Sequence, residues 1–391
     1  MMKRLMILAA AMLVAAAMTG LAVCDNRSPY AAWERGPSAD PSWFPLAVWM
    51  QNPEYAVRYK AAGINVYVAL SGRALDTQLE TLRAAGMRVV CSQNERTFKY
   101  KDDPIIAAWM HGDEPDNAQS LGEGKGWGPP IPAERIIANY ERIRAADPSR
   151  PVFLNLGQGV AWDGWYGRGV RTNHPEDYLE YIKGGDIISF DIYPVASPDS
   201  AVQGNLWYVP HGVGRLREWT NSRKLVWNCI ECTRIQSGRK AAPDQVRSEV
   251  WMSLIRGSGG IIYFVHEWTP AFNDHALLDD PEMLTAVTAL NTQIRELAPV
   301  LNSPAVDSAA EVNSSNPAVP VGVMMKMYKG DTYLFTAAMR DGKTRAVFSL
   351  KGAPVAAVAE VIGEGRSIPV RRGGFEDEFG SYGVHLYQIH K

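Results

Sequence analysis

Acidic side chains directly follow an apolar segment in the first third of the chain. Residues 105–110 are apolar, as in a strand buried on both faces of a sheet, and His111, Asp113 and Glu114 come soon after them. Pro115 then prevents the strand from continuing. Carboxylates at the end of a buried strand must be paired, protonated or used in chemistry, because their desolvation is costly. The structural alternative is that Asp113 caps a helix that begins at Pro115.

The elements that would position these residues alternate between strand-like and helix-like segments. The strand candidates are Pro45–Trp49, Asn65–Leu70, Arg88–Ser92, Ile105–Met110, Val152–Leu156, Ile187–Ile192, Leu225–Ile230 and Gly260–Val265. Helical patterns follow most of them, for example at Ala133–Ala146 and Pro243–Arg256. Such alternation is typical of an α/β fold in which a parallel sheet closes into a (β/α)8 TIM barrel. A doubly wound open sheet is the alternative, but no glycine-rich phosphate turn follows the first strand.

The pattern changes after residue 302. Short strand candidates separated by Lys-Gly-Asp and Asp-Gly turns indicate a small all-β sandwich domain. These candidates are Met324–Tyr328, Thr332–Ala337, Ala346–Ser349, Ala357–Ile362 and Val384–Ile389. We therefore expect a catalytic barrel at 44–302 and a C-terminal β-sandwich at 303–391.

Barrel enzymes build their chemistry at the carboxyl ends of the strands. Glu114 and Glu231 would lie there on strands four and seven, nearly opposite each other across the barrel mouth. Two carboxylates that face each other across a cleft are the machinery of glycoside hydrolysis, one protonating the leaving oxygen and the other attacking or stabilising the sugar cation. A separation of roughly 5–5.5 Å would give retention and one of about 6.5–9.5 Å inversion. The sequence thus predicts these two glutamates as catalytic. It predicts substrate-binding roles for Asp113, His111, Asn155, Gln158, Trp162, Asp191, Tyr193, Trp227, His266, Glu267 and Trp268.

This arrangement resembles clan A of the glycoside hydrolases, which are retaining (β/α)8 enzymes, such as β-galactosidases and β-glycanases, that often carry a C-terminal β-sandwich. The resemblance covers most of the chain but rests on scattered short motifs. It implies that Glu114 is the acid/base and Glu231 the nucleophile of a double displacement on β-glycosidic bonds. It also implies that Tyr193 bonds to the nucleophile and that Trp268 forms the floor of a sugar subsite. The clan usually has Asn where this chain has Asp113.

Two alternatives stay open at this point. Asp113-Glu114 also resembles the Asp-Glu pair of substrate-assisted β-N-acetylhexosaminidases, in which the Asp orients the acetamido group of the substrate and the Glu is the acid. On that interpretation Glu231 only binds substrate. The other alternative is a non-catalytic carbohydrate-binding barrel, which would keep the tryptophans but would not need both carboxylates.

Aromatic and histidine residues favour a sugar ligand over a metal ion. The chain has 12 Trp, and several lie in Gly-rich loops expected on the active face: Trp127, Trp162, Trp165 and Trp207. Sugar rings can stack their apolar faces on such side chains, although a loop Trp that anchors the barrel rim is equally common. The histidines lack the spacing of metal ligands. We therefore expect an oligo- or polysaccharide substrate, with no metal and no cofactor.

The N-terminal sequence indicates export. A charged start and a short apolar run resemble a secretory signal peptide at 1–22, followed by a lead at 23–43. The protein would then be secreted or periplasmic, with lipidation of Cys24 as an alternative. The formal net charge of −2 argues against a nucleic-acid partner, and no later run is apolar enough to span a membrane.

Overall fold

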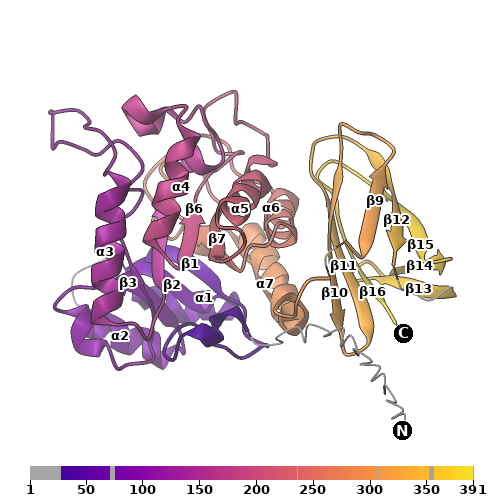
Figure 1. Ribbon diagram of the computed structural model, residues 1–391, viewed down its shortest axis with the longest axis horizontal. Coiled ribbons are helices and arrows are strands. Elements are labelled where there is room, and N and C mark those ends of the chain that lie inside the picture. The colour runs from indigo at the N-terminus through magenta and orange to yellow at the C-terminus, as the bar shows by residue number, and fades with distance from the viewer. Residues whose placement is uncertain (1–27, 71–74, 236, 307, 352–355, 391) are drawn as a thin grey trace, which may run out of the picture.

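The chain forms two bodies that lie side by side (Figure 1). The computed structural model describes residues 28–70, 75–235, 237–306, 308–351 and 356–390, so the expected signal peptide and Cys24 lie outside the described residues. One body is a closed barrel of parallel strands and the other an antiparallel sheet of eight strands. The predicted (β/α)8 barrel followed by an all-β domain is confirmed. Within the described residues, no helix is long and apolar enough to cross a membrane.

The barrel strands pair in chain order, and the last strand pairs with the first to close the sheet. They are β1 (Leu46–Gln51), β2 (Val66–Leu70), β3 (Arg88–Ser92), β4 (Ile106–Met110), β5 (Val152–Leu156), β6 (Ile187–Phe190), β7 (Leu225–Glu231) and β8 (Gly260–Phe264). The helices around them are α1 (Ala56–Ala61), α2 (Leu75–Ala84), α3 (Ala133–Ala146), α4 (Tyr178–Tyr181), α5 (Tyr208–Trp219), α6 (Pro243–Ile255) and α7 (Pro281–Leu301). Between β3 and β4 a 3-10 turn, Thr97–Tyr100, takes the place of an α-helix.

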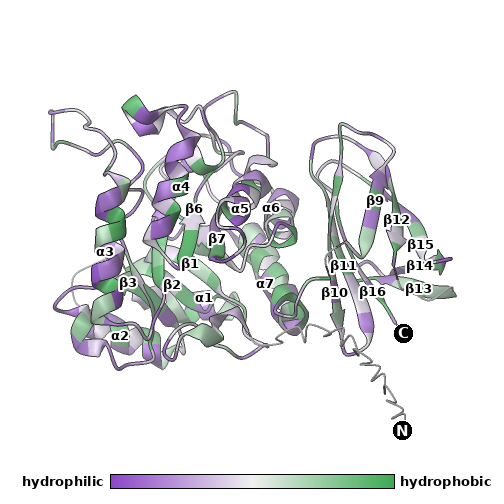
Figure 2. Cartoon of the chain, in the orientation of Figure 1, coloured by the Kyte–Doolittle hydropathy of each residue, from purple (hydrophilic) through white to green (hydrophobic). Residues whose placement is uncertain are grey.

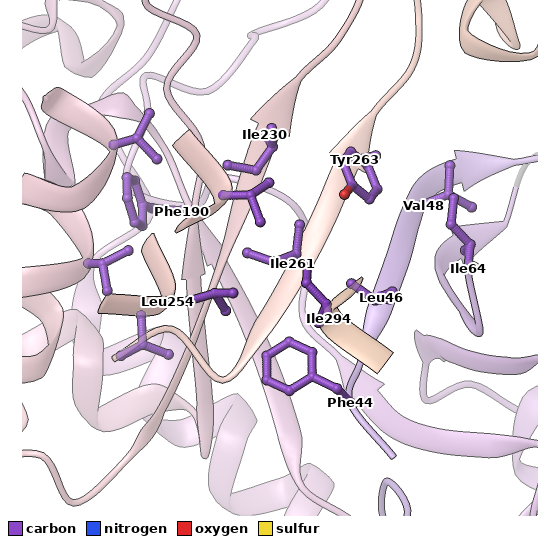
Figure 3. Close-up of a cluster of buried hydrophobic side chains, with 14 of the residues drawn as sticks. Phe44, Leu46, Val48, Ile64, Phe190, Ile230, Leu254, Ile261, Tyr263 and Ile294 are labelled. Atoms are coloured by element: carbon purple, nitrogen blue, oxygen red, sulfur yellow. The ribbon is translucent and has the colours of Figure 1, made fainter. Parts of the chain in front are cut away.

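Alternate residues of each barrel strand face the interior and the helix layer, because successive side chains of a strand point to opposite faces. In β1, Ala47 and Trp49 pack inside the barrel, whereas Leu46 and Val48 pack in the outer layer. Figure 3 shows part of this outer layer, where Leu46 lies near Ile294 of α7. Figure 2 shows the barrel strands as mainly hydrophobic, as expected of a parallel sheet buried on both faces.

The segment that precedes β1 closes the amino end of the barrel. The hydroxyl of the buried Tyr30 donates to the carbonyl oxygen of Gly259 at 2.7 Å. The hydroxyl oxygen of Tyr30 in turn accepts from Nε1 of Trp227 at 2.9 Å. Trp227 therefore points into the barrel interior near its amino end, far from the carboxyl ends of the strands.

The C-terminal sheet has the order β10-β11-β16-β13-β14-β15-β12-β9. Its strands are β9 (Ala310–Ser314), β10 (Val321–Tyr328), β11 (Asp331–Ala338), β12 (Thr344–Leu350), β13 (Ala356–Val361), β14 (Arg366–Arg371), β15 (Gly374–Phe379) and β16 (Val384–Ile389). The sheet encloses a core of its own around Phe348 and Tyr387. It packs on α6, where the rings of Trp251 and Phe335 stack at 5.5 Å. Sequence analysis did not identify β9, β14 and β15, because these strands are short and their exposed faces are polar.

The Tyr30 hydroxyl should contribute measurably to stability. Tyr30→Phe removes the partner of two buried polar groups and should lower the free energy of unfolding by about 1–3 kcal/mol. Denaturant unfolding measures this change. The matched control is Tyr166→Phe, since Tyr166 is 60% exposed. Equal stability of the two variants would contradict the role given to Tyr30.

Candidate active site

A pocket of about 680 Å³ opens at the carboxyl ends of the barrel strands. Residues that end or follow β1, β4, β5, β6, β7 and β8 line it, as expected for a site on this face of a barrel. They are Trp49, Met50, Asp113, Glu114, Gln158, Trp165, Asp191, Tyr193, Ile235, Phe264, His266, Trp268, Thr269 and Phe272. None of these described residues is Lys or Arg, so the carboxyl groups of the lining have no cationic partner within it.

The loop after β4 brings two of these carboxyl groups into the pocket. Glu114 has a φ of 40°, in the left-handed region that non-glycine residues rarely adopt. Gly157, after β5, allows the Glu114 side chain to approach closely, because a Cβ there would lie 2.8 Å from Glu114 Oε1. Asn155 Nδ2 donates to Asp113 Oδ1 at 2.9 Å and fixes the second carboxyl group. Strained backbone held by its surroundings is a feature of functional sites.

A third carboxyl group, Asp191, comes from the end of β6 and meets Glu114. Burial raises the pKa of Glu114 well above its usual range, and the nearby charges of Asp191 and Asp113 raise it further. The two carboxyl groups lie close enough for one to hydrogen-bond to the other once it holds a proton. Burial also raises the pKa of Asp191, to about 7, although accepting the bond from Glu114 opposes that rise. The raised pKa values of both groups favour a proton shared between the Glu114 and Asp191 carboxyl groups.

Aromatic rings form one wall of the pocket. Phe264 and Trp268 stack at 5.8 Å with an interplanar angle of 19°, and His266 stacks on Trp268 at 5.7 Å. Trp268 is 47% exposed and Phe272 is 63% exposed, so large apolar faces are available to a ligand. Trp49 and Trp165 add aromatic surface elsewhere in the lining. Such a wall can bind a flat apolar face.

Polar atoms without partners converge on the same place. Asp191 Oδ1, the Tyr193 hydroxyl and His266 Nδ1 are buried, and none has a hydrogen-bond partner among the described residues. Oδ1 of Asn155, beside Asp113, is likewise buried without a hydrogen-bond partner among the described residues. Buried polar groups are normally hydrogen-bonded, so this cluster suits a ligand that carries several donors and acceptors.

Glu231 does not line the pocket. Its side chain is fully buried. Its Oε1 accepts from the backbone N–H of Val195 at 2.6 Å and its Oε2 from that of Ala196 at 2.7 Å. The loop after β6 therefore covers Glu231. The sequence-based role of this residue as a nucleophile is not supported by the geometry, because both of its carboxylate oxygens are engaged away from the pocket.

Some other predicted binding residues also lie elsewhere. Ring nitrogens of His111 lie 2.7 Å from Gly184 O and 2.9 Å from Asn139 Nδ2, in the helix layer. Glu267 pairs with Arg234, and Trp162 packs against Trp165 outside the lining. Trp227 is inside the barrel, as described above. Gln158, Asp191, Tyr193, His266 and Trp268 line the pocket, together with Asp113 and Glu114.

Sequence reasoning missed the apolar part of the lining. Trp49 and Met50 end β1, and Phe264 ends β8, so the strand-end rule would have found them had it been applied to apolar side chains. Phe272 and Ile235 follow in loops whose course the sequence does not reveal. Trp165 was noted as a loop aromatic but was not assigned to the site.

No protein-family model matches the sequence, and no curated protein is detectably similar to it. Solved structures share its fold. A GH42 β-galactosidase from G. stearothermophilus matches with a TM-score of 0.56 and 10% identity, over 93% of this chain and 100% of that chain. A putative α-galactosidase/melibiase from Bacteroides fragilis matches with a TM-score of 0.50 and 11% identity, over 89% of this chain and 79% of that chain. A maltogenic α-amylase from Thermotoga neapolitana matches with a TM-score of 0.50 and 10% identity, over 90% of this chain and 99% of that chain. At these identities the likeness concerns the architecture of barrel and sheet domain.

The raised pKa of Asp191 predicts a pH-dependent cost in stability. Unfolding returns this pKa to its usual value near 3.8, so the unfolded chain loses the proton at lower pH than the folded chain does. Stability should therefore fall as pH rises from about 4 to about 7. Asp191→Asn removes this cost, and its stability gain over the wild type should grow across that window, to no more than about 4 kcal/mol.

Urea unfolding at pH 4 and pH 8 measures this difference. Glu123→Gln, which removes an exposed carboxylate, is the control. A gain for Asp191→Asn that is the same at both pH values would show that Asp191 does not take up a proton in the folded protein.

Proposed function

We propose that the protein is a glycoside hydrolase whose reaction takes place in the barrel-mouth pocket, with Glu114 as the general acid. The observation that carries this proposal is the buried Glu114 carboxyl group, whose pKa is raised by burial and by the nearby Asp191, in a pocket with an aromatic wall and unpartnered polar atoms. A sugar offers an apolar face to the wall and hydroxyl groups to the polar atoms. Its glycosidic oxygen needs a proton to leave, and Glu114 can supply one near neutral pH. The substrate class is an oligo- or polysaccharide.

The attacking group is not supplied by Glu231 in this proposal. A double displacement needs a carboxylate roughly 5–5.5 Å from the acid with the anomeric carbon between them. Glu231 lies under the loop that follows β6. Asp191 interacts directly with Glu114, and in this proposal it accepts a hydrogen bond from the acid and does not attack the sugar.

One observation favours a substrate-assisted mechanism, in which a 2-acetamido group of the sugar attacks its own anomeric carbon. That group needs an acceptor for its N–H and a donor for its carbonyl oxygen. The pocket offers both, since Asp113 and Asp191 are acceptors and the Tyr193 hydroxyl is a donor. We propose β-N-acetylhexosaminide hydrolysis as the more specific form of the function. We also propose export of the protein, which is supported by its N-terminal sequence alone.

Glu114→Gln should abolish catalysis and leave sugar binding intact. The amide keeps the shape of the side chain but cannot release a proton, so kcat should fall by roughly 10²–10⁴-fold on substrates with a poor leaving group. A panel of natural and aryl glycosides measures this, with Glu123→Gln as the control. Wild-type turnover by Glu114→Gln would refute the assignment. Sugar binding without hydrolysis by the wild type would indicate a non-catalytic carbohydrate-binding barrel.

Asp113→Asn tests the substrate-assisted mechanism. The change removes a charge that would hold the acetamido N–H as the group attacks, so kcat should fall by about 10²–10³-fold, as when one preorganised transition-state contact is lost. Hydrolysis should also require the 2-acetamido group. Equal rates on paired sugars that carry a 2-acetamido or a 2-hydroxyl group, together with a mild effect of Asp113→Asn, would contradict this mechanism.

A further inference from the structure

Glu231 has a partner that the proposed reaction does not use. Glu249 lies in α6 among apolar residues, and its side chain is fully buried, like that of Glu231. No described residue donates a hydrogen bond to either carboxyl oxygen of Glu249, and the ionisable group that acts on Glu249 is Glu231. Two neighbouring carboxyl groups can hydrogen-bond to each other only when one of them holds a proton. A pair that shares one proton carries a single negative charge.

The pair holds the loop that carries two pocket residues. The Val195 and Ala196 amides donate to Glu231, and these residues follow Asp191 and Tyr193 by a few positions. Hydrogen bonds from backbone N–H groups to a charged carboxylate are stronger than bonds between neutral groups, so these two bonds hold the short segment firmly. The opposite side of the loop is held by Arg239, which donates to the carbonyl oxygens of Val195 and Ser197.

The charges around the pair explain which of its members keeps the proton. Burial raises the pKa of Glu231 to about 7, and the amides of Val195 and Ala196 and the bond from Glu249 oppose that rise. Burial also raises the pKa of Glu249 well above its usual range, and the Glu231 charge adds to the shift. The nearby titratable groups do not neutralise the pair. Cys232 is a buried thiol, and Lys240 forms an ion pair with Asp280.

We propose that Glu231 and Glu249 are positioning residues that share one proton and clamp the segment 193–196 to α6, which fixes Asp191 and Tyr193 in the pocket. Glu249 donates, and Glu231 accepts from Glu249 and from the two amides. Removal of the shared proton at high pH places two negative charges in one buried space, which is strongly unfavourable. The clamp then opens and the segment is released. The effect on catalysis rests on the proposed function, whereas the clamp itself does not.

Hydrogen exchange of the Val195 and Ala196 amides tests the clamp without any substrate. In the wild type both amides should be protected, and their protection factors should fall at high pH. Glu249→Gln keeps a donor that cannot ionise, so protection should persist across the pH range. Glu231→Gln loses the charged acceptor, and protection should fall by tenfold or more at every pH. Glu296→Gln, an exposed change on α7, is the control.

Equal protection in Glu231→Gln and the wild type would overturn the proposal. If Glu231→Gln does not fold, as judged by circular dichroism, the comparison of Glu249→Gln with the wild type decides. The proposal is then overturned when the two proteins lose protection at the same pH.

Activity separates positioning from nucleophilic attack. Glu231→Ala with added azide should show no recovery of rate and no glycosyl azide, and its kcat should fall while KM changes little. Recovery with glycosyl azide as the product would make Glu231 the nucleophile and overturn the proposal. If the wild type hydrolyses no glycoside at all, the proposed function fails, and the exchange data still decide on the clamp.

Discussion

The burial of carboxyl groups without cations is the constraint on which the catalytic end of the barrel depends. Neither Glu114 with Asp191 nor Glu231 with Glu249 has a Lys or Arg hydrogen-bonded to it among the described residues. Two adjacent carboxylates cannot both ionise at low cost in such surroundings. We therefore assign one shared proton to each pair, one in the pocket and one beneath the loop after β6. The pair of Glu114 and Asp191 supplies an acid near neutral pH. The pair of Glu231 and Glu249 holds the loop that carries Asp191.

The rest of the barrel serves to keep these groups in place. Gly157 gives Glu114 room, and Asn155 orients Asp113. Behind the pocket, the fully buried Asp116 accepts from the Gly157 amide at 3.0 Å and from the Tyr178 hydroxyl at 2.7 Å, which ties the loops after β4 and β5 together. Such supporting hydrogen bonds preorganise a site and so avoid reorganisation during the reaction. The unfavourable pKa shifts lower stability locally, and the large apolar core of the barrel offsets that cost.

Sequence alone predicted the barrel well, because its strands are continuous apolar runs with helices between them. It also predicted Asp113, Glu114 and Asp191, since strand ends are the place for polar side chains. It placed Glu231 at the barrel mouth, whereas the structure buries this residue at the end of β7 under the loop after β6, whose course the sequence does not reveal. One signal was present in the sequence. Glu249 directly precedes the apolar residues 250–252 in a helical segment, and a buried acid at such a position needs a partner. The strands β9, β14 and β15, which the sequence did not reveal, are half-exposed and polar, so the hydrophobic alternation that marks a strand was weak in them.

The central claim is that Glu114 holds the proton and Asp191 accepts the hydrogen bond. Neutron diffraction from deuterium-exchanged crystals near neutral pH locates that proton directly. The account predicts a deuteron on the Glu114 carboxyl group, directed at Asp191. A Glu114 carboxylate without a deuteron, whether Asp191 is protonated or both groups are ionised, would contradict it.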